Sequence, residues 1–372
     1  MKEPEKKRKK NPLIPVLILL SACTLCMVML CILLTLKTFK TEDGGFSFWN
    51  KKSEETTEDE FASDEPVPIV YTEEEVNYMV GEAWVQGGAD KEAEIKSIIR
   101  AEAESNAPSM AALLRKMFTE CFVYPGDGRF YFVDINTQYP LNPYVRENFV
   151  TEDNGYRYYT EGGEKQSLLC IDVSAHQGAI DWPKVAESGV KATMIRTGYR
   201  GYGSGKMVED EYVDGNIQGA MANGMITGLY FFSQAVTAEE IDEEAEVLLN
   251  YARTYNTNGP IAIDVEKLDA DTARQNGLSS EERTALVKHF CEKVKEAGYE
   301  PVIYGNGYSL FTMMNYDELS AYPIWYAYYS DNLYFPYETF MWQYSSSGKV
   351  PGINADVDLN VMFKNIVENS AG

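Results

Sequence analysis

Histidine and cysteine are scarce in this chain of 372 residues. The two histidines are His176 and His289, and three of the six cysteines lie within one apolar stretch near the N-terminus. The other three cysteines are scattered along the chain: Cys121, Cys170 and Cys291. Structural zinc sites need Cys and His ligands at short, regular spacings. We therefore expect no zinc site, at most one disulfide outside the apolar stretch, and most simply none.

Positive charge is also in short supply. The chain has 33 Lys and Arg against 57 Asp and Glu, a net charge of −24. Its first ten residues nevertheless hold six cations (Lys2, Lys6, Lys7, Arg8, Lys9 and Lys10), so the remainder is more acidic still. An acidic body argues against binding to nucleic acid or to an anionic membrane surface. It is compatible with an extracellular protein whose substrate is neutral or cationic.

The N-terminal region predicts a membrane anchor. Residues 12–36 carry no charge and are long enough to span a bilayer as a helix. The basic tail, residues 1–11, predicts a cytoplasmic N-terminus and places the rest of the chain outside the cell. A cleaved signal peptide would have a shorter apolar region. The string Leu20–Cys23 resembles a lipoprotein processing box, which would leave Cys23 lipidated, but the apolar run continues to Leu36. We favour the uncleaved, single-pass anchor.

Two further segments precede the main domain. Residues 37–68 are rich in Glu, Asp, Ser and Thr and predict a disordered acidic linker. Residues 69–165 predict a small α+β module, with helical periodicity over 73–87 and 91–118 and strands at 129–135 and 156–159. This module shows no recognisable chemistry. We interpret it as a small spacer or packing module whose role and protein partners the sequence does not identify.

From residue 166 to 366 the pattern changes to apolar strands that alternate with amphipathic helices. Eight strands are expected at 168–174, 192–199, 226–233, 260–266, 301–304, 324–329, 340–344 and 356–362. Helices are expected at 182–188, 210–223, 238–255 and 279–297, with a short one at 308–314. The alternation predicts an α/β fold: a (β/α)₈-like parallel barrel with reduced helices in its second half.

Four carboxylates stand out on these strands. Asp264 and Glu266 are two residues apart at the end of the fourth strand, so they point to the same side. Two carboxylates this close raise the pKa of one of them, as a general acid requires. Asp172 lies in the first strand and Asp358 in the eighth, which are neighbours once the barrel closes. An isolated Asp-x-Glu is usually a solvated strand end, but four acids at one barrel mouth favour a glycosidase-like site.

Residues 168–363 resemble the family 25 glycoside hydrolases, the lysozymes known as N,O-diacetylmuramidases. The segments that carry the resemblance occur in the family's order: Asp172–Gly178, Ile180–Trp182, Ile195–Tyr199, Gly228–Ser233, Asp264–Glu266, Trp342–Ser345, Pro351–Ile353 and Val357–Asn360. The resemblance implies cleavage of the β-1,4 bond between N-acetylmuramic acid and N-acetylglucosamine in peptidoglycan, with retention of configuration. It implies no metal or organic cofactor.

The resemblance also assigns roles to the four acids. Glu266 matches the general acid. Asp264 matches the acid that stabilises the oxocarbenium-like transition state or orients the substrate's 2-acetamido group as an internal nucleophile; the sequence does not decide between the two. Asp172 and Asp358 match acids that position sugar and water and keep Glu266 protonated. Asp356 shares a face with Asp358, so an error in register would exchange them.

Several other side chains are candidates for substrate binding. Tyr230 and Trp342 are the preferred stacking partners for sugar rings, followed by Tyr304 and Trp325. Filling of the barrel core is an equally good interpretation of each aromatic residue, including Phe232, Tyr326 and Tyr328. Arg196 either pairs with a site carboxylate or forms an ordinary structural ion pair. Glycine-rich residues 201–205 read as a flexible loop at the mouth.

Together these patterns predict a hydrolase anchored in a bacterial cell membrane, with its catalytic domain outside the cell. Two other functions remain open. One is a catalytically silent protein that grips cell-wall glycan or assembles partners on it. The other is an enzyme that acts on a different N-acetylated glycan, such as chitin.

Overall fold

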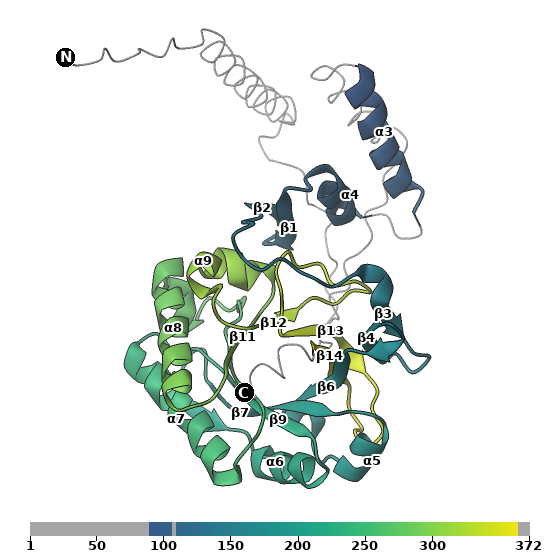
Figure 1. The fold of residues 1–372 in the computed structure, drawn as a ribbon. Helices are drawn as coiled ribbons and strands as arrows, with labels where there is room; N and C mark the ends of the chain where they lie inside the picture. The colour runs from purple at the N-terminus through teal and green to yellow at the C-terminus, as the bar shows by residue number, and fades with distance from the viewer. Residues whose placement is uncertain (1–88, 106–108, 364–372) are drawn as a thin grey trace, which may run out of the picture. The chain divides into compact units, whose positions relative to one another are not determined.

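The computed structural model describes residues 89–105 and 109–363 (Figure 1). The predicted basic tail, membrane anchor at 12–36 and acidic linker lie outside the described residues. Within the described residues, no helix is both long and apolar enough to cross a membrane.

Eight strands close into a barrel, as predicted, because the first of them pairs with both the second and the last. A further short strand, β8 (Met207–Glu209), pairs with the second barrel strand and lies outside the ring. Around the barrel the strands are β6 (Ser167–Val173), β7 (Ala192–Arg200), β9 (Ile226–Phe232), β10 (Ile261–Asp264), β11 (Pro301–Gly305), β12 (Ile324–Ala327), β13 (Met341–Gly348) and β14 (Val357–Phe363).

The expectation of a wholly parallel barrel is wrong at the last strand. Neighbouring strands from β6 to β13 are parallel, but β14 is antiparallel to both β13 and β6. The connection from β13 to β14 is a loop without a helix, and such a connection returns the chain in the opposite direction. The start of β14 therefore lies beside the end of β6, with Asp358 opposite Asp172 in the ladder.

Helices cover only part of the barrel's outer wall. Four helices follow the early strands, and after β11 only short turns of helix remain, as predicted (Figure 1). Side chains cap the first turns of three of these four helices, for example Ser279 in a capping box with Glu282. The helices are α5 (Trp182–Glu187), α6 (Val213–Ala222), α7 (Ala238–Tyr255) and α8 (Ser280–Glu296), followed by a π-helical turn, Ser309–Met313, and α9 (Tyr316–Leu319).

The described residues before 166 are called the extension from here on. From Phe122 onward the extension packs against the barrel, whereas Ile99 and Leu113 before it form a small cluster of their own. The buried aromatic side chains of the extension belong to the same cluster as the outer wall of the barrel. The helix expected over 91–118 is two helices, because Ser109 caps a new one. The extension contains α3 (Ala89–Ala103), α4 (Met110–Met117), the hairpin β1 (Cys121–Gly126) and β2 (Arg129–Asp134), and the small sheet β3 (Phe149–Thr151), β4 (Arg157–Glu161) and β5 (Glu164–Lys165).

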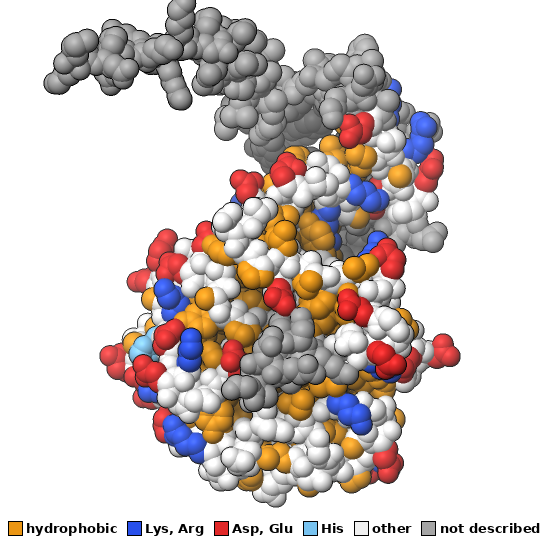
Figure 2. Space-filling view, viewed as in Figure 1, with side chains coloured by type: hydrophobic (Ala, Val, Ile, Leu, Met, Phe, Trp, Pro, Cys, Tyr) orange, Lys and Arg blue, Asp and Glu red, His pale blue; other side chains and the backbone are white. Residues whose placement is uncertain are grey.

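The surface reflects the acidic composition. In the face drawn in Figure 2, acidic side chains project around the periphery of the barrel, with basic side chains interspersed among them. The carboxylates at the barrel mouth, in contrast, point inward from the strands.

Candidate active site

The four predicted acids lie at one mouth of the barrel. Asp264 is the last residue of β10, and Glu266 follows it by two, so both face the interior. Asp172 is near the end of β6 and is the direct ladder partner of Asp358. Asp172 and Glu266 both raise the pKa of Asp358 electrostatically, which places the two pairs close together. The rule that reacting groups follow strand ends covers three of these acids; Asp358 joins them because its strand runs backwards.

Two amide side chains hold Asp172. Its Oδ2 accepts hydrogen bonds from Nε2 of Gln343 at 2.9 Å and from Nδ2 of Asn360 at 2.8 Å. Burial raises the pKa of Asp172 to about 6, and these two hydrogen bonds oppose the rise because they stabilise the charged form. Asp172 is thus a buried carboxylate with a prepared set of donors.

The amides themselves are fixed in orientation. Oε1 of Gln343 accepts hydrogen bonds from the hydroxyls of Tyr304 at 2.9 Å and Tyr329 at 3.0 Å, so its NH₂ group must face Asp172. Oδ1 of Asn360 accepts from Nε1 of Trp325 at 2.8 Å. The sequence analysis missed Gln343 and Asn360 as site residues. The sequence could have indicated Asn360, because residues two apart on a strand point to the same side and Asn360 therefore faces inward with Asp358.

The pKa values of the remaining three acids are also raised. Burial, Glu266 and Asp172 together raise the pKa of Asp264 well above its usual range. Its Oδ1 has no hydrogen-bond partner among the described residues. Burial also raises the pKa of Glu266, which remains partly exposed. Burial and the neighbouring acids raise the pKa of Asp358 to about 9. Glu266 is the partly exposed acid of this group, and the upward direction of its pKa shift suits a proton donor.

Arg196 forms a structural ion pair. Its Nε and NH2 lie 3.0 and 2.9 Å from Oδ2 of Asp210, which also accepts a hydrogen bond from the backbone N–H of Ala175. Arg196 still acts on the site, because its charge lowers the pKa of Asp264. Asp210, which the sequence analysis did not single out, fixes this cation beside the acids.

Three of the four preferred aromatic residues face the barrel interior. Trp325 contacts the rings of Tyr304 and Tyr230 edge to face, with centroids 4.8 and 5.8 Å apart. Trp325 is 1% exposed and fills the core beneath the acids. Tyr304 is buried and Tyr230 is partly exposed, so Tyr230 is the one best placed to meet a ligand.

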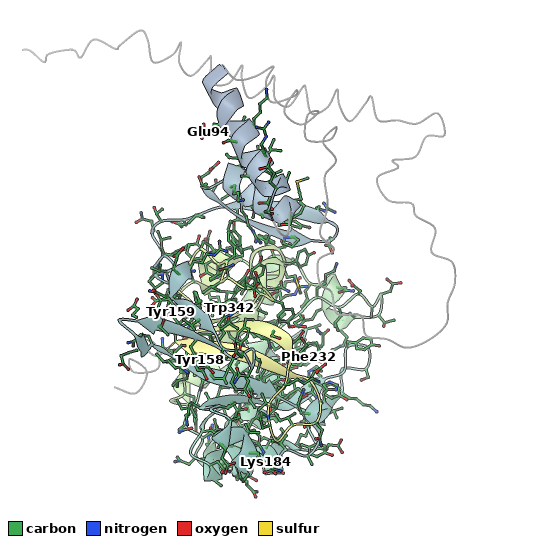
Figure 3. The ribbon with its side chains drawn as sticks, turned by 90° about the vertical axis from the view of Figure 1, so that its right-hand side faces the viewer. Glu94, Tyr158, Tyr159, Lys184, Phe232 and Trp342 are labelled. Atoms are coloured by element: carbon green, nitrogen blue, oxygen red, sulfur yellow. The ribbon has the colours of Figure 1, made fainter. Side chains whose placement is uncertain are left out.

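The structure does not bring Trp342 to the mouth. Alternation along β13 turns Gln343 inward and Trp342 outward, where it is fully buried between the barrel and the extension. Its ring lies 5.2 Å from that of Phe149, and its Nε1 donates to the backbone oxygen of Tyr328. Trp342 is labelled in Figure 3, together with Tyr158 and Tyr159 of the extension. Tyr326 also packs on this outer side, in the cluster that contains Trp342.

The other candidates lie outside the acid group. Asp356 is exposed and pairs with Lys349, so Asp358 is the member of that pair that faces the site. His176 is exposed, and His289 pairs with Asp242 of α7. Within 89–105 and 109–363, no group of His, Cys, Asp and Glu has the geometry of a metal site. A cavity at the opposite end of the barrel, lined by residues such as Pro260 and Met362, is separate from the acids.

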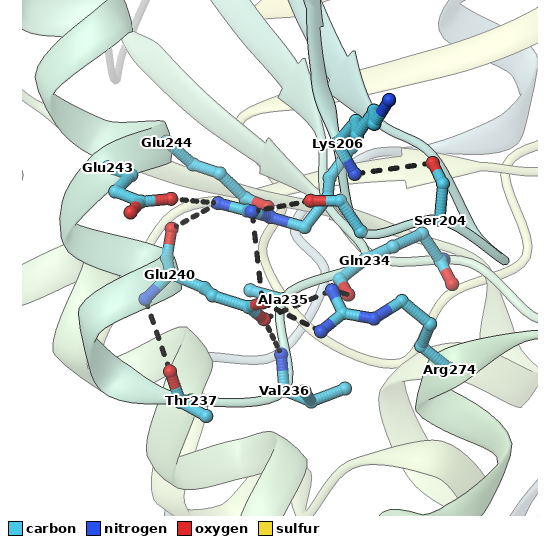
Figure 4. A network of polar contacts seen from close by, with 12 residues as sticks. Ser204, Lys206, Gln234, Ala235, Val236, Thr237, Glu240, Glu243, Glu244 and Arg274 are labelled. Atoms are coloured by element: carbon cyan, nitrogen blue, oxygen red, sulfur yellow. Dashed lines mark hydrogen bonds and ion pairs between the residues drawn. The ribbon is translucent and has the colours of Figure 1, made fainter.

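Two arginines anchor the loops around the mouth (Figure 4). Arg200 donates to Glu244 at 2.6 Å and to the backbone oxygen of Gly205, which ties the glycine-rich loop to α7. Arg274 donates to Glu240 at 2.7 Å, and its backbone N–H donates to the backbone oxygen of Tyr202. The loop at 201–205 is therefore held at several points rather than free.

The barrel region is similar to known proteins. The model of the family "Glycosyl hydrolases family 25" matches residues 171–353. The uncharacterized protein YegX of Escherichia coli O6:H1 is 30% identical over 210 residues, which are 54% of this chain and 71% of YegX. Lysozyme M1 of Streptomyces globisporus is 26% identical over 201 residues, covering 51% of this chain and 66% of that protein.

The modular autolysin LytC from Streptococcus pneumoniae is 24% identical, with a TM-score of 0.48 and coverage of 65% of this chain. The present chain spans 58% of the length of that structure.

Proposed function

The chain belongs to glycosyl hydrolases family 25 and is a glycoside hydrolase, and we propose that it cleaves the β-1,4 bond between N-acetylmuramic acid and N-acetylglucosamine in peptidoglycan. The observation that carries the proposal is the meeting of Asp172, Asp264, Glu266 and Asp358 at one mouth. Two relatives support the substrate: Lysozyme M1, and LytC, which has been solved with a synthetic peptidoglycan ligand.

In the proposed reaction Glu266 protonates the leaving glycosidic oxygen. Its raised pKa keeps a proton available, and its partial exposure allows contact with substrate. Asp264 acts in its ionised form, in which it stabilises the positive charge that develops on the sugar or orients the 2-acetamido group. The negative charge of Asp172 raises the pKa of Glu266 and so helps to keep it protonated. Asp358 lies beside Asp172, and hydrogen bonds from Gln343 and Asn360 keep Asp172 in place. Retention of configuration is part of this proposal.

The test is hydrolysis of purified peptidoglycan by the full-length protein. Glu266→Gln keeps the shape of the side chain but cannot donate a proton, so the release of reducing ends should fall by about 10²–10⁴-fold. Glu282→Gln, a change at the start of α8, is a matched control and should leave the rate unchanged. Full activity in Glu266→Gln would contradict the assignment of the acid.

The identity of the products separates the alternatives. Mass spectrometry of the released fragments should show N-acetylmuramic acid at the new reducing end, whereas cleavage of chitin but not peptidoglycan would point to another N-acetylated glycan. Binding to peptidoglycan without any turnover would favour a silent glycan-binding protein. Four acids gathered at one mouth favour the enzyme, because so much buried negative potential is unfavourable unless it serves chemistry.

We also propose that residues 12–36 tether this hydrolase to a bacterial membrane with the barrel on the outer side. The support is the length and apolarity of that stretch and the basic tail before it. Recovery of the protein in the membrane fraction after a high-salt wash, and its release into the soluble fraction when residues 1–36 are deleted, would agree with a tether. Recovery of both forms in the soluble fraction would contradict it.

A further inference from the structure

The hairpin of β1 and β2 packs tightly on the barrel rim beside Glu266. The hydroxyls of Tyr124 and Thr312 lie 2.9 Å apart, and the backbone N–H of Val123 donates to the hydroxyl of Tyr334. A Cβ on Gly126 would lie 2.2 Å from Cδ2 of Tyr308, so only glycine allows this approach. The hairpin is therefore fixed on the loop that follows β11.

The tip of the hairpin presents a carboxylate. Asp127 and Gly128 both have positive φ, 49° and 70°, as the two-residue turn of a tight hairpin requires. This geometry directs one carboxylate oxygen of Asp127 to Nζ of Lys267 and the other to the hydroxyl of Tyr308 at 2.5 Å. Both donors lower the pKa of Asp127, so the side chain is ionised at neutral pH.

Lys267 directly follows Glu266, and both residues lie beyond the end of strand β10. The last ladder partners of β10 are those of Asp264, so Glu266 lies beyond the paired residues. The chain from 265 to 273 is irregular, and at its far end Arg274 is bound to Tyr202 and Glu240. At the start of this segment, the ion pair between Lys267 and Asp127 ties the chain to the hairpin.

We propose that the extension takes part in catalysis: Asp127 is a positioning residue that fixes the segment after β10 and thereby holds Glu266 in place for proton transfer. This inference rests on the proposed function, because it concerns the geometry of the same acid. It follows from the contacts of Asp127 with Lys267 and Tyr308, two residues from neighbouring loops of the mouth. A displacement of about 1 Å at a reacting group can lower a rate by up to about 10²-fold, so a tether of this kind has a measurable effect.

The experiment compares Asp127→Asn with Asp134→Asn in the full-length protein. Asn tolerates positive φ, so the first change keeps the turn and removes the charge. Asp134 lies in the same hairpin, and its side chain accepts a hydrogen bond from Sγ of Cys121, which is also in the hairpin. In Asp127→Asn, kcat on peptidoglycan should fall about three- to tenfold with KM little changed. Asp134→Asn should match the wild type, and both should unfold at the wild-type temperature.

Two further measurements separate positioning from a general structural role. Lys267→Met should lower kcat as Asp127→Asn does, and the double variant should be no worse than either alone, because both remove one interaction. Amide hydrogen exchange should accelerate over residues 265–273 in Asp127→Asn but not in Asp134→Asn. Unchanged exchange or additive losses in kcat would overturn the inference. If the wild type itself hydrolyses no peptidoglycan, the proposed function fails, and the exchange result alone decides the positioning role.

Discussion

The outer wall of the barrel is covered in two different ways. Helices α6, α7 and α8 pack on β7, β9 and β11, whereas β4 of the extension packs on β6 and β14. The hairpin β1–β2 lies over the residues that follow β11 and β12. The extension therefore takes the place that helices would occupy in the second half of the barrel. The region that the sequence predicts as a spacer or packing module thus covers part of the barrel wall.

The two covers use different chemistry. A helix presents a regular stripe, and on the helical side that stripe is mostly aliphatic. Short strands and loops offer fewer positions per unit area, so large rings fill the space on the other side. The buried residues of the helical cover include Val185, Ile217, Leu248, Leu249, Val287 and Val294, and those of the extension include Phe122, Tyr124, Tyr156, Tyr158 and Tyr159.

Tyrosine hydroxyls also accept hydrogen bonds from backbone N–H groups of the extension. A loop-rich cover buries N–H groups that no helix or strand satisfies. The hydroxyls of Tyr334, Tyr337 and Tyr344 accept hydrogen bonds from the backbone N–H groups of Val123, Asn136 and Arg157, respectively. Each ring thus supplies apolar area and a polar tip at one position.

Removal of the cover should have the largest effect. A chain that begins at residue 166 exposes the outer faces of Trp342, Tyr344 and Phe363, which are now at most 6% exposed. We expect this chain to aggregate or to lack near-ultraviolet circular dichroism, with no measurable hydrolysis. A chain that begins at residue 109 keeps the hairpin and the small sheet and should remain folded and active. A folded, active 166–372 chain would show that the extension is a spacer after all.

Single core residues provide the next test. Trp342→Ala on the extension side should lower the free energy of unfolding by about 3–5 kcal/mol, and Leu248→Ala in α7 by about 2–5 kcal/mol. Urea unfolding measures both. The milder Trp342→Phe should reduce stability while leaving kcat/KM on peptidoglycan unchanged, because Trp342 faces away from the mouth. A selective rise in KM in Trp342→Phe would instead restore the sugar-stacking role that the sequence suggested.

The sequence predicted the helical half of the barrel better than the other half. Strand positions and α5–α8 follow from hydrophobic periodicity and capping residues such as Ser279, which are local signals. The direction of β14 and the docking of the extension depend on contacts between distant parts of the chain, such as Tyr344 with Arg157, and no local pattern records them. The same limit applies in the site. The acids stand out by type, whereas the role of Gln343 depends on the hydroxyls of Tyr304 and Tyr329.

The acids contributed by β6 and β14 should make stability depend on pH. The folded-state pKa values, about 6 for Asp172 and about 9 for Asp358, exceed the ordinary value of 3.8, so the folded protein binds more protons than the unfolded chain above about pH 4. The free energy of unfolding should therefore fall as pH rises from 5 to 8.

Two variants locate this effect. Of these two acids, Asp358 has the larger pKa shift. In Asp358→Asn, the free energy of unfolding, measured with urea at pH 5, 6, 7 and 8, should therefore decrease less steeply with pH than in the wild type. Asp356→Asn changes an exposed neighbour that pairs with Lys349 and should keep the wild-type slope. Equal slopes in wild type and Asp358→Asn would mean that these acids do not control the dependence.

The smallest predicted effect comes from the loss of single tyrosine hydroxyls, one on the side of the barrel covered by the extension and one on the side covered by helices. Tyr344→Phe leaves the buried backbone N–H of Arg157 without its acceptor, and an unsatisfied buried donor lowers the free energy of unfolding by about 1–3 kcal/mol. Tyr251→Phe in α7 removes a hydroxyl that donates to the exposed Glu209, where water can replace it, so the change should be within about 0.5 kcal/mol. Chemical denaturation of both variants at one pH measures the difference. Equal losses would mean that the tyrosines on the extension side stabilise the fold through their rings alone. Water would then satisfy the backbone N–H groups as well as the tyrosine hydroxyls do.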